Sequence, residues 1–333
     1  MNQGLEPSPA APPPPLGAVP PTLAVETLGL SRRFGELTAV DAIHLRVERG
    51  TFYGFLGPNG AGKSTTIKML TGLLAPSAGA MRILGEDLAQ PERALAVKRR
   101  VGVVPENLSL FENLTGREYL TFIGRMYLLP RDTIRERTEE LLVMMGLEGE
   151  EKKLALEYSH GMRKKLALAA ALLPNPELLF LDEPSTGLDP QVRLEIHKLI
   201  EELKDAKRTI LLTTHYIEEA ERLCDRVAII DAGRIIALGS PREIQQQTLD
   251  KSVIEIECEQ PLPEAVPEFL AGVKHSFSET RTGLTVHSAQ PARAIVDLVK
   301  WIDQNSLPLS DIHLKRPTLE DVFIELTGKK LRE

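Results

Sequence analysis

A glycine-rich segment with a single lysine has the residue types and spacing of a phosphate-binding loop. Residues 57–64 read GPNGAGKS, which matches the pattern GxxxxGK[ST] in full between a strand-like and a helix-like run. Glycines let main-chain amides wrap around phosphate oxygens, and the start of the helix adds its positive end. That context disfavours a chance glycine-rich turn. The residues expected to contact the nucleotide are Gly57, Pro58, Asn59, Gly60, Ala61, Gly62, Lys63, Ser64 and Thr65. Lys63 should reach the β- and γ-phosphates, and Ser64 should bind Mg²⁺.

Two adjacent acids end another strand-like run and could supply metal binding and water activation. Residues 178–184 read LLFLDEP, so Asp182 and Glu183 follow the apolar segment directly. A phosphate-binding loop needs a second group for the metal and a group that orients water. Taken alone, two acids after a strand more often cap a helix, but beside GPNGAGKS they favour catalysis. Asp182 is then expected to hold Mg²⁺, and Glu183 to polarise the attacking water.

A Ser-His-Gly turn lies ahead of these acids in the chain. Residues 158–162 read YSHGM and precede a helix-forming run. Ser159 is a residue type that caps helix N-termini, which is the ordinary interpretation of such a turn. The first amides of a helix also lack partners and carry the positive end of its dipole, so the same turn could bind an anion. His215 follows a further apolar run, where a lone histidine is usually structural.

Composition limits the classes of protein to consider. The chain has 333 residues, enough for two domains, and a formal net charge of −7, which argues against bulk attraction to nucleic acid. Cys224 and Cys258 lack metal-ligand spacing and fit a reducing compartment. No window approaches the roughly 18 to 20 consecutive apolar residues of a membrane helix, so the sequence predicts no membrane-spanning segment. Residues 1–22 are rich in proline and are expected to form a disordered tail.

Strand-like and helical runs alternate from residue 23 onward, which indicates an α/β domain with a largely parallel sheet. Between residues 115 and 173 the strand signals vanish, and we expect a helical subdomain at about 110–174. A GSP break near residue 240 should end this domain, and a polar connection follows. The predicted buried strands are short and almost wholly apolar, at residues 51–57, 101–104, 178–181, 209–214 and 227–230.

The last part of the chain, residues 252–333, predicts a second, smaller domain. Its runs read strand, helix, strand, strand, helix, strand and helix, which suggests a ferredoxin-like βαββαβ sandwich with one added helix. The first of these helices is expected in PEAVPEFLAG, and a turn at Thr282 and Gly283 should join the two middle strands. No group of acids, histidines or cysteines suggests catalysis, so we expect a structural or regulatory α+β accessory domain.

With these motifs in this order, residues 23–240 resemble the nucleotide-binding domains of ATP-binding cassette (ABC) proteins. The resemblance rests on GPNGAGKS, YSHGM and LLFLDEP. It implies a P-loop NTPase fold of ABC type, with a mostly parallel sheet, an antiparallel β edge and the inserted helical subdomain. YSHGM occupies the place of the family's LSGGQ turn, which closes over ATP held by a second copy. Ser159 and the amide of Gly161 would therefore face the γ-phosphate of a partner's nucleotide.

The resemblance also implies roles for residues that carry no signal alone. Asp189 in STGLD matches the D-loop, which crosses the dimer and helps to place the water of the opposite site. His215 matches a histidine that contacts the γ-phosphate and the acid at Glu183. Phe34 occupies the position of the aromatic ring that stacks on adenine, with a core aromatic as the alternative.

The sequence departs from the family pattern at three positions. Glu106 replaces the usual glutamine after the VGVVP run, and it could still bind Mg²⁺ together with Ser64 and Asp182 while adding negative charge. In the YSHGM turn, His160 stands for a glycine and Met162 for a glutamine. Because Ser159 and Gly161 remain, the contact with a partner's nucleotide should survive.

YSHGM, Glu106 and the C-terminal PTLEDVFIELTGKK look like a subgroup, the ATPases of ABC-2-type exporters, which includes daunorubicin-resistance and sodium-efflux systems. This implies an ATPase that uses ATP and Mg²⁺, dimerises through ATP as a homodimer or with a related ATPase, and drives an integral membrane permease of ABC-2 type. It would be cytoplasmic and peripheral at the inner face of the cell membrane. The competing hypothesis is a soluble ABC-type ATPase acting on ribosomes or chromosomes. The single uninterrupted cassette disfavours it, and no nucleic acid is expected as a partner.

Overall fold

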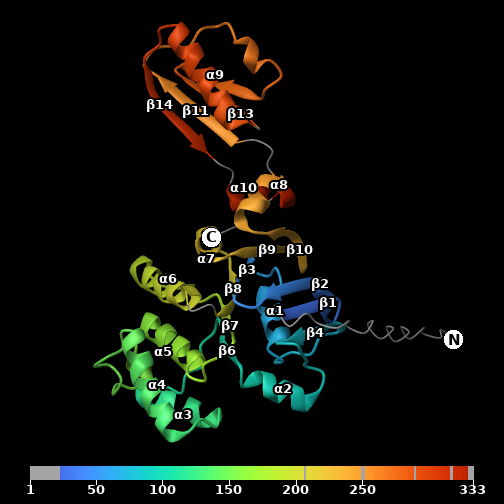
Figure 1. Ribbon diagram of the computed structural model, residues 1–333, viewed down its shortest axis with the longest axis vertical. Coiled ribbons are helices and arrows are strands. Elements are labelled where there is room, and N and C mark those ends of the chain that lie inside the picture. The colour runs from blue at the N-terminus through green and yellow to red at the C-terminus, as the bar shows by residue number, and fades with distance from the viewer. Residues whose placement is uncertain (1–22, 206–207, 249–251, 289, 316–317, 329–333) are drawn as a thin grey trace, which may run out of the picture. The chain divides into compact units, whose positions relative to one another are not determined.

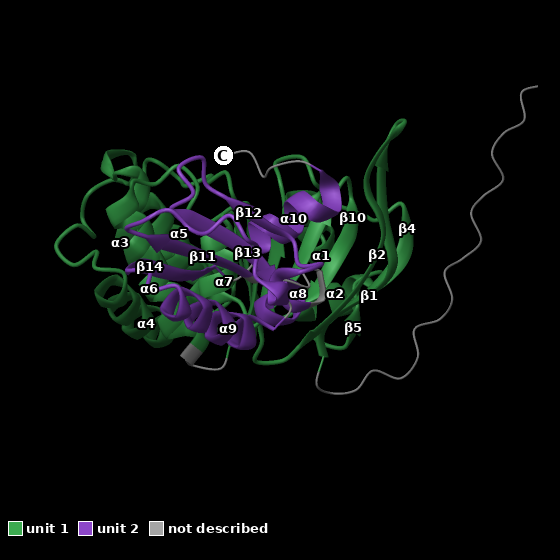
Figure 2. Ribbon diagram, turned by 90° about the horizontal axis from the view of Figure 1, so that it is seen from above, with its two compact units in different colours: residues 1–240, 332–333 green, residues 241–331 purple. Residues whose placement is uncertain are grey.

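The computed structural model describes residues 23–205, 208–248, 252–288, 290–315 and 318–328, and the predicted proline-rich tail at 1–22 lies outside them. The chain divides into two compact units, residues 1–240 with 332–333 and residues 241–331 (Figures 1 and 2). Within the described residues, no helix has the length and apolar character needed to cross a membrane.

The first unit contains a six-stranded sheet that carries the functional loops. Its strand order is β10-β9-β3-β8-β7-β6, and all neighbours are parallel except the β9–β10 pair at one edge. The predicted apolar runs form the buried strands, so the expected parallel sheet is confirmed. The strands are β3 (Phe52–Leu56), β6 (Val101–Val104), β7 (Leu178–Asp182), β8 (Thr209–Thr214), β9 (Arg226–Asp231) and β10 (Arg234–Gly239).

A second sheet of four antiparallel strands, in the order β2-β1-β4-β5, supplies the antiparallel part of the fold. Helix α1 (Lys63–Leu70) buries Ile67, Met69 and Leu70 in a core that both sheets share. The glycine-rich loop before α1 is thereby anchored to a rigid interior. The strands are β1 (Leu23–Phe34), β2 (Leu37–Glu48), β4 (Ala78–Ile83) and β5 (Glu86–Asp87).

Helices occupy the region where strand signals are absent from the sequence. Figure 1 shows α3 (Gly116–Met126), α4 (Arg131–Met144) and α5 (His160–Leu172) gathered together. Thr115 and Glu118 form a capping box at the start of α3. A side chain at Gly124 would meet Ile134, so α3 and α4 pack closely. The other helices of the unit are α2 (Pro91–Lys98), η1 (Ala155–Glu157), α6 (Pro190–Asp205) and α7 (Ile217–Leu223).

The second unit has an antiparallel sheet in the order β12-β13-β11-β14, which is the ferredoxin-like order expected for it. Helix α9 (Pro291–Gln304) packs Leu298, Trp301 and Ile302 into the core of this sheet. The strands are β11 (Ser252–Cys258), β12 (His275–Phe277), β13 (Gly283–Ser288) and β14 (Leu309–Lys315).

Two local predictions for this part of the chain are wrong, and a third is right only in part. The helix expected in PEAVPEFLAG is reduced to the single turn η2 (Glu268–Leu270), because prolines interrupt the segment and Pro267 starts that turn. The polar connection after residue 240 is helix α8 (Pro241–Thr248), which buries Ile244 and packs on α10 (Leu319–Thr327). The turn that joins the middle strands is present at residues 278–282 and includes Thr282, as expected, with Arg281 at φ 56°, but Gly283 already begins β13.

One charged cluster lies at the amino-terminal ends of the central strands, and it leads to a prediction about how stability depends on pH. Glu177, just before β7, contacts Arg49 at 2.6 Å and Arg100 at 2.9 Å. The Arg100 hydrogen bonds lower the pKa of Glu177 to about 2, so its stabilisation is complete above the ordinary pKa of about 4.5 and is lost as pH falls toward 2. We expect Glu177→Gln to reduce the free energy of unfolding by about 1 kcal/mol at pH 7, a value limited by solvent screening of this exposed group.

Urea unfolding at pH 7 and pH 3 measures this effect. The difference between wild type and variant should shrink at pH 3. Glu195→Gln, which removes a partly exposed contact to Lys165 at 2.7 Å, is the matched control and should show a smaller difference at pH 7. A Glu177→Gln effect of equal size at both pH values would rule out the ionic origin of this stabilisation.

Candidate functional site

The GPNGAGKS segment forms a loop between β3 and α1, as its sequence context predicts. A side chain at Gly57 would lie 2.2 Å from the carbonyl oxygen of Ile230. Gly62 has φ 104°, and a Cβ there would lie 2.5 Å from the carbonyl oxygen of Ala39. Only glycine fits these positions. The main chain of the loop therefore lies close to two neighbouring segments, and the first turn of α1 begins directly after the loop.

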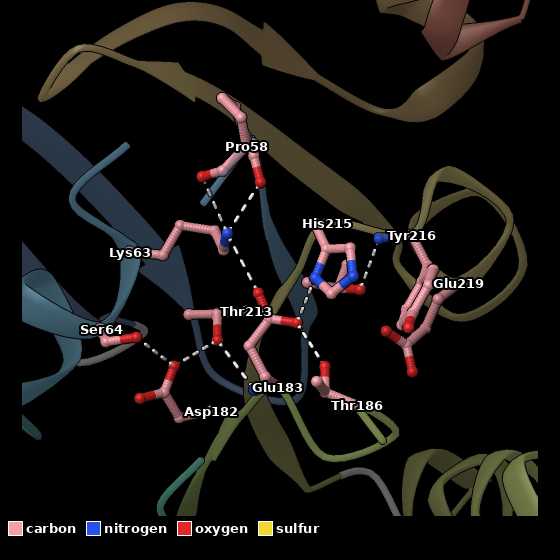
Figure 3. A network of polar contacts seen from close by, with 12 residues as sticks. Pro58, Lys63, Ser64, Asp182, Glu183, Thr186, Thr213, His215, Tyr216 and Glu219 are labelled. Atoms are coloured by element: carbon pink, nitrogen blue, oxygen red, sulfur yellow. Dashed lines mark hydrogen bonds and ion pairs between the residues drawn. The ribbon is translucent and has the colours of Figure 1, made fainter. Parts of the chain in front are cut away.

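Ser64 and Asp182, the residues predicted to bind a metal, lie together at the carboxyl end of β7. The hydroxyl of Ser64 donates to Asp182 Oδ1 at 3.1 Å, and the hydroxyl of Thr213 donates to the same oxygen at 2.6 Å (Figure 3). Hydroxyl and carboxylate oxygens are ligands that Mg²⁺ prefers, so the chemistry of this pair fits that ion.

Glu183 is the most constrained residue of the site. Its side chain is 4 % exposed, and Oε2 accepts from His215 Nδ1 at 2.7 Å and from the Thr186 hydroxyl at 2.8 Å. Its main chain has φ 50°, a strained value for a residue with a side chain. Burial alone would raise the pKa of Glu183, but the His215 hydrogen bond and the Lys63 cation outweigh burial and hold that pKa below its usual value. The carboxylate is therefore ionised and can polarise a water molecule.

Lys63 joins the loop to this carboxylate. Its ammonium lies 3.0 Å from Glu183 Oε1 and donates to the carbonyl oxygens of Gly57 at 2.7 Å and Pro58 at 3.1 Å. The lysine and the glutamate are each about 5 % exposed or less. Figure 3 shows the ammonium between the loop and the acids. A buried cation thus lies between the main chain of the loop and the Glu183 carboxylate.

Phe34 lies at the end of β1, and its ring is 46 % exposed. The Arg32 guanidinium lies 4.6 Å from the ring centroid. The ring is therefore a surface group rather than the core aromatic of the alternative interpretation, and it presents a π surface next to a cation.

Ser159, Gly161 and Asp189 form a separate group at the starts of α5 and α6. Ser159 is the N-cap of α5 and accepts from the amide of Met162 at 3.2 Å, whereas Asp189 accepts from the amide of Val192 at 3.1 Å. A side chain at Gly161 would lie 2.5 Å from Val192 Cγ1, so glycine lets the helices approach closely. Within the described ranges, no hydrogen bond or ion pair connects this group to the Lys63–Glu183 cluster.

Glu106 lies in the exposed loop after β6. Its carbonyl oxygen accepts from Lys164 Nζ at 3.0 Å, and its carboxylate makes no hydrogen bond or ion pair with Ser64 or Asp182 in the described part of the chain. Lys164 was not among the predicted site residues. Lys164 lies on α5 three residues after Gly161 and four residues before Leu168, which are both buried. This helical spacing places Lys164 on the buried face of the helix and could have identified it from the sequence.

Comparisons with known proteins agree with these motifs. The ABC transporter family matches residues 40–186. The daunorubicin resistance ATP-binding protein DrrA3 of Streptomyces coeruleorubidus is 38% identical over 93% of this chain and 97% of its own length. The Nod factor export ATP-binding protein I of Ralstonia nicotianae is 40% identical over 94% of this chain and 96% of its own. A solved ATP-binding subunit of an ABC transporter matches with a TM-score of 0.61 and 35% identity, over 67% of this chain and 92% of that one.

Proposed function

The chain belongs to the ATP-binding subunits of ABC transporters, which hydrolyse ATP to drive transport, and we propose that it powers export through a separate membrane permease of ABC-2 type. The similarity extends over nearly the whole length of relatives named for drug resistance and Nod factor export. That similarity carries the export part of the proposal, and the cluster of Lys63, Asp182, Glu183 and His215 beside the glycine-rich loop carries ATP hydrolysis. The ribosome or chromosome alternative has no support from these relatives.

Each residue of the cluster has a role in this proposal. The glycine-rich loop and Lys63 would bind the β- and γ-phosphates, and Ser64 and Asp182, with Glu106, would hold Mg²⁺. When bound, that ion would neutralise charge that develops on the phosphates. Glu183 orients the attacking water as an ionised base, and His215, which donates to it through Nδ1, fixes the orientation of its carboxylate. Phe34 stacks on adenine with its exposed ring.

We further propose that two copies of the chain, or this chain and a related ATPase, close on ATP. Ser159 and Asp189 have exposed side chains, and with Gly161 they make no polar contact with the Lys63–Glu183 cluster of their own chain within the described residues. The first turn of α5 offers unpaired amides and the positive end of a dipole. A nucleotide on the opposite copy would satisfy these groups, and hydrolysis would remove that match and let the dimer open.

The permease would bind the first unit at an apolar pocket of about 240 Å³, which is lined by residues at and beyond the C-terminal end of α1, on α2 and on β6. Leu73 follows α1, Leu88 precedes α2, Val103 lies on β6 and Tyr127 follows α3, so the pocket touches the far end of the helix that starts at the loop and the strand that leads to Glu106. Apolar side chains from a cytoplasmic loop of a membrane protein fit such a surface. This arrangement would place the chain at the inner face of the cell membrane.

Purification of the tagged full chain from detergent-solubilised membranes tests this proposal. We expect a polytopic membrane protein to co-purify in stoichiometric amount, and Leu73→Asp to reduce its recovery at least about tenfold, because burying an unpaired charge is unfavourable. Leu95→Asp, on an exposed residue of α2 outside the pocket, is the matched control. Recovery of ribosomal RNA in place of a membrane protein would overturn the export function.

A further inference from the structure

Lys164 is a buried cation in the first turns of α5 that the roles above do not use. It is 2% exposed, and its ammonium donates to the carbonyl oxygen of Glu106 at 3.0 Å and to that of Glu183 at 3.3 Å. Lysines are almost never fully buried without partners. The side chains of the two neighbours on α5, Arg163 and Lys165, are 31 % and 15 % exposed. Lys164 therefore has a more specific task than surface solvation.

The contact with Glu183 acts on the strained part of the site. The Glu183 amide donates to Thr213, to the hydroxyl at 3.0 Å and to the carbonyl oxygen at 3.1 Å. Lys164 holds the carbonyl oxygen on the other side of the same residue. A residue with φ 50° keeps this conformation only when its surroundings impose it, and the direction of the Glu183 carboxylate depends on that conformation.

Lys164 also lies in the field of three carboxylates. Burial lowers the pKa of Lys164, and the negative charges of Glu106, Asp182 and Glu183 oppose that shift without cancelling it. Lys63 is the other buried cation of the site and pairs directly with Glu183. Glu106 brings an additional acid to the loop after β6, and Lys164, bonded to the main chain of that same residue, is placed to offset it.

We propose that Lys164 is a positioning residue for ATP hydrolysis, which holds the main chain of Glu183 in its active conformation and offsets the negative charge of Glu106. It touches neither the phosphates nor the water and acts through Glu183. This inference rests on the proposed function only in taking Glu183 as the residue that orients water.

Lys164→Met removes the ammonium and keeps most of the apolar stem. We expect kcat for ATP hydrolysis to fall about 30-fold with KM changed less than about threefold, because a small displacement of a catalytic group slows chemistry strongly while the phosphate-binding loop is untouched. Lys165→Met on the same helix is the matched control and should stay within about twofold of wild type in kcat. A Lys164→Met enzyme with kcat within twofold of wild type would overturn the proposal.

A double-mutant cycle with Glu106→Gln tests the charge. Because the neutral amide removes the acid that Lys164 offsets, Lys164→Met should lower kcat only about fivefold in the Glu106→Gln background. An equal loss in both backgrounds would contradict the electrostatic part. Glu106→Gln leaves the main-chain carbonyl group of residue 106 in place. The loss of kcat that remains in this background therefore measures the contribution of the contact between Lys164 and the Glu183 carbonyl oxygen.

Two further measurements distinguish a failure of this proposal from a folding defect and from a failure of the proposed function. Lys164→Arg restores a cation with hydrogen-bond donors, so we expect it to recover most of kcat. A Lys164→Arg enzyme that is as slow as Lys164→Met and has unchanged thermal unfolding would count against the proposal. If Lys164→Met does not fold, the Lys164→Arg and Lys165→Met pair decides. Absence of ATP hydrolysis by the wild-type chain with its permease would refute the proposed function, whereas the ratios between variants test only Lys164.

Discussion

Glu183→Gln should reduce kcat for ATP hydrolysis by about 10³-fold, because the amide cannot accept a proton from the attacking water and general-base catalysis contributes on this scale. The substitution keeps size and shape, and the contacts that hold Lys63, Ser64 and Asp182 do not depend on an ionised Glu183 except for the Lys63 ion pair. Nucleotide binding should therefore remain within about fivefold of wild type. Steady-state hydrolysis and a titration with a fluorescent ATP analogue measure the two quantities.

The same variant should accumulate an ATP-bound dimer, because the state that precedes hydrolysis can no longer decay. Size-exclusion chromatography with MgATP should show it, and removal of the nucleotide should return the monomer. Glu219→Gln is the matched control, since Glu219 on α7 is also buried and also bonds a histidine, His197 on α6, at 2.9 Å, but makes no hydrogen bond or ion pair with Lys63, Asp182 or Glu183 within the described residues. Its hydrolysis should stay within about threefold of wild type. A Glu183→Gln protein that stays monomeric with MgATP would remove the support for closure on ATP.

The glycine-rich loop and the strands that lead to it could be predicted because local chemistry determines them. Gly57 and Gly62 occupy positions where any side chain would overlap a main-chain oxygen, and the short apolar strands have no alternative place except the buried sheet. The same local reasoning fails at 263–272, where helical spacing is present but the prolines leave only η2. It also fails for α8, whose polar sequence is helical in the structure, where α8 packs on α10 and Ile244 is buried.

Contacts between segments distant in the sequence could not be predicted. The bond from Lys164 to the Glu183 carbonyl depends on how α5 lies beside the end of β7, and no spacing within one segment encodes it. The strained main chain of Glu183 likewise results from its neighbours, among them Thr213 on β8. The sequence identified the carboxylate, and the three-dimensional arrangement explains how it is held.

The turn at Ser159 supports both interpretations that its sequence allows. Its hydroxyl caps α5, and Gly161 is needed where α5 approaches Val192, so each residue has a structural reason within one chain. Neither reason conflicts with binding a phosphate of a second copy, because an exposed N-cap hydroxyl can also donate to an anion. The proposed dimer therefore needs a test in which the fold is kept, which the Glu183→Gln variant provides.

Lys63→Ala should raise the Kd for ATP at least about 100-fold, because a charge-assisted contact with a phosphate in a buried setting is worth about 3 kcal/mol. The Lys63 side chain is 5 % exposed and its ammonium donates to the loop carbonyls of Gly57 and Pro58, so it is already in place beside the loop proposed to bind the phosphates. Titration with a fluorescent ATP analogue in the presence of Mg²⁺ measures the change. Lys68→Ala, on the exposed face at the end of the same helix, controls for a general loss of positive charge.

Lys63→Ala also removes the cation next to Glu183. This second effect makes it possible to tell whether lost ATP binding arises from a lost phosphate contact or from the unpaired charge of Glu183. Removal of the cation should raise the pKa of Glu183 toward its ordinary value and lower the stability of the first unit, since a buried carboxylate then keeps only its hydrogen bonds to His215 and Thr186. Lys63→Ala combined with Glu183→Gln removes both charges and should recover that stability without recovering ATP binding. If the double variant regained wild-type affinity for ATP, the lysine would act by neutralising Glu183, and its assignment to the phosphates would fall.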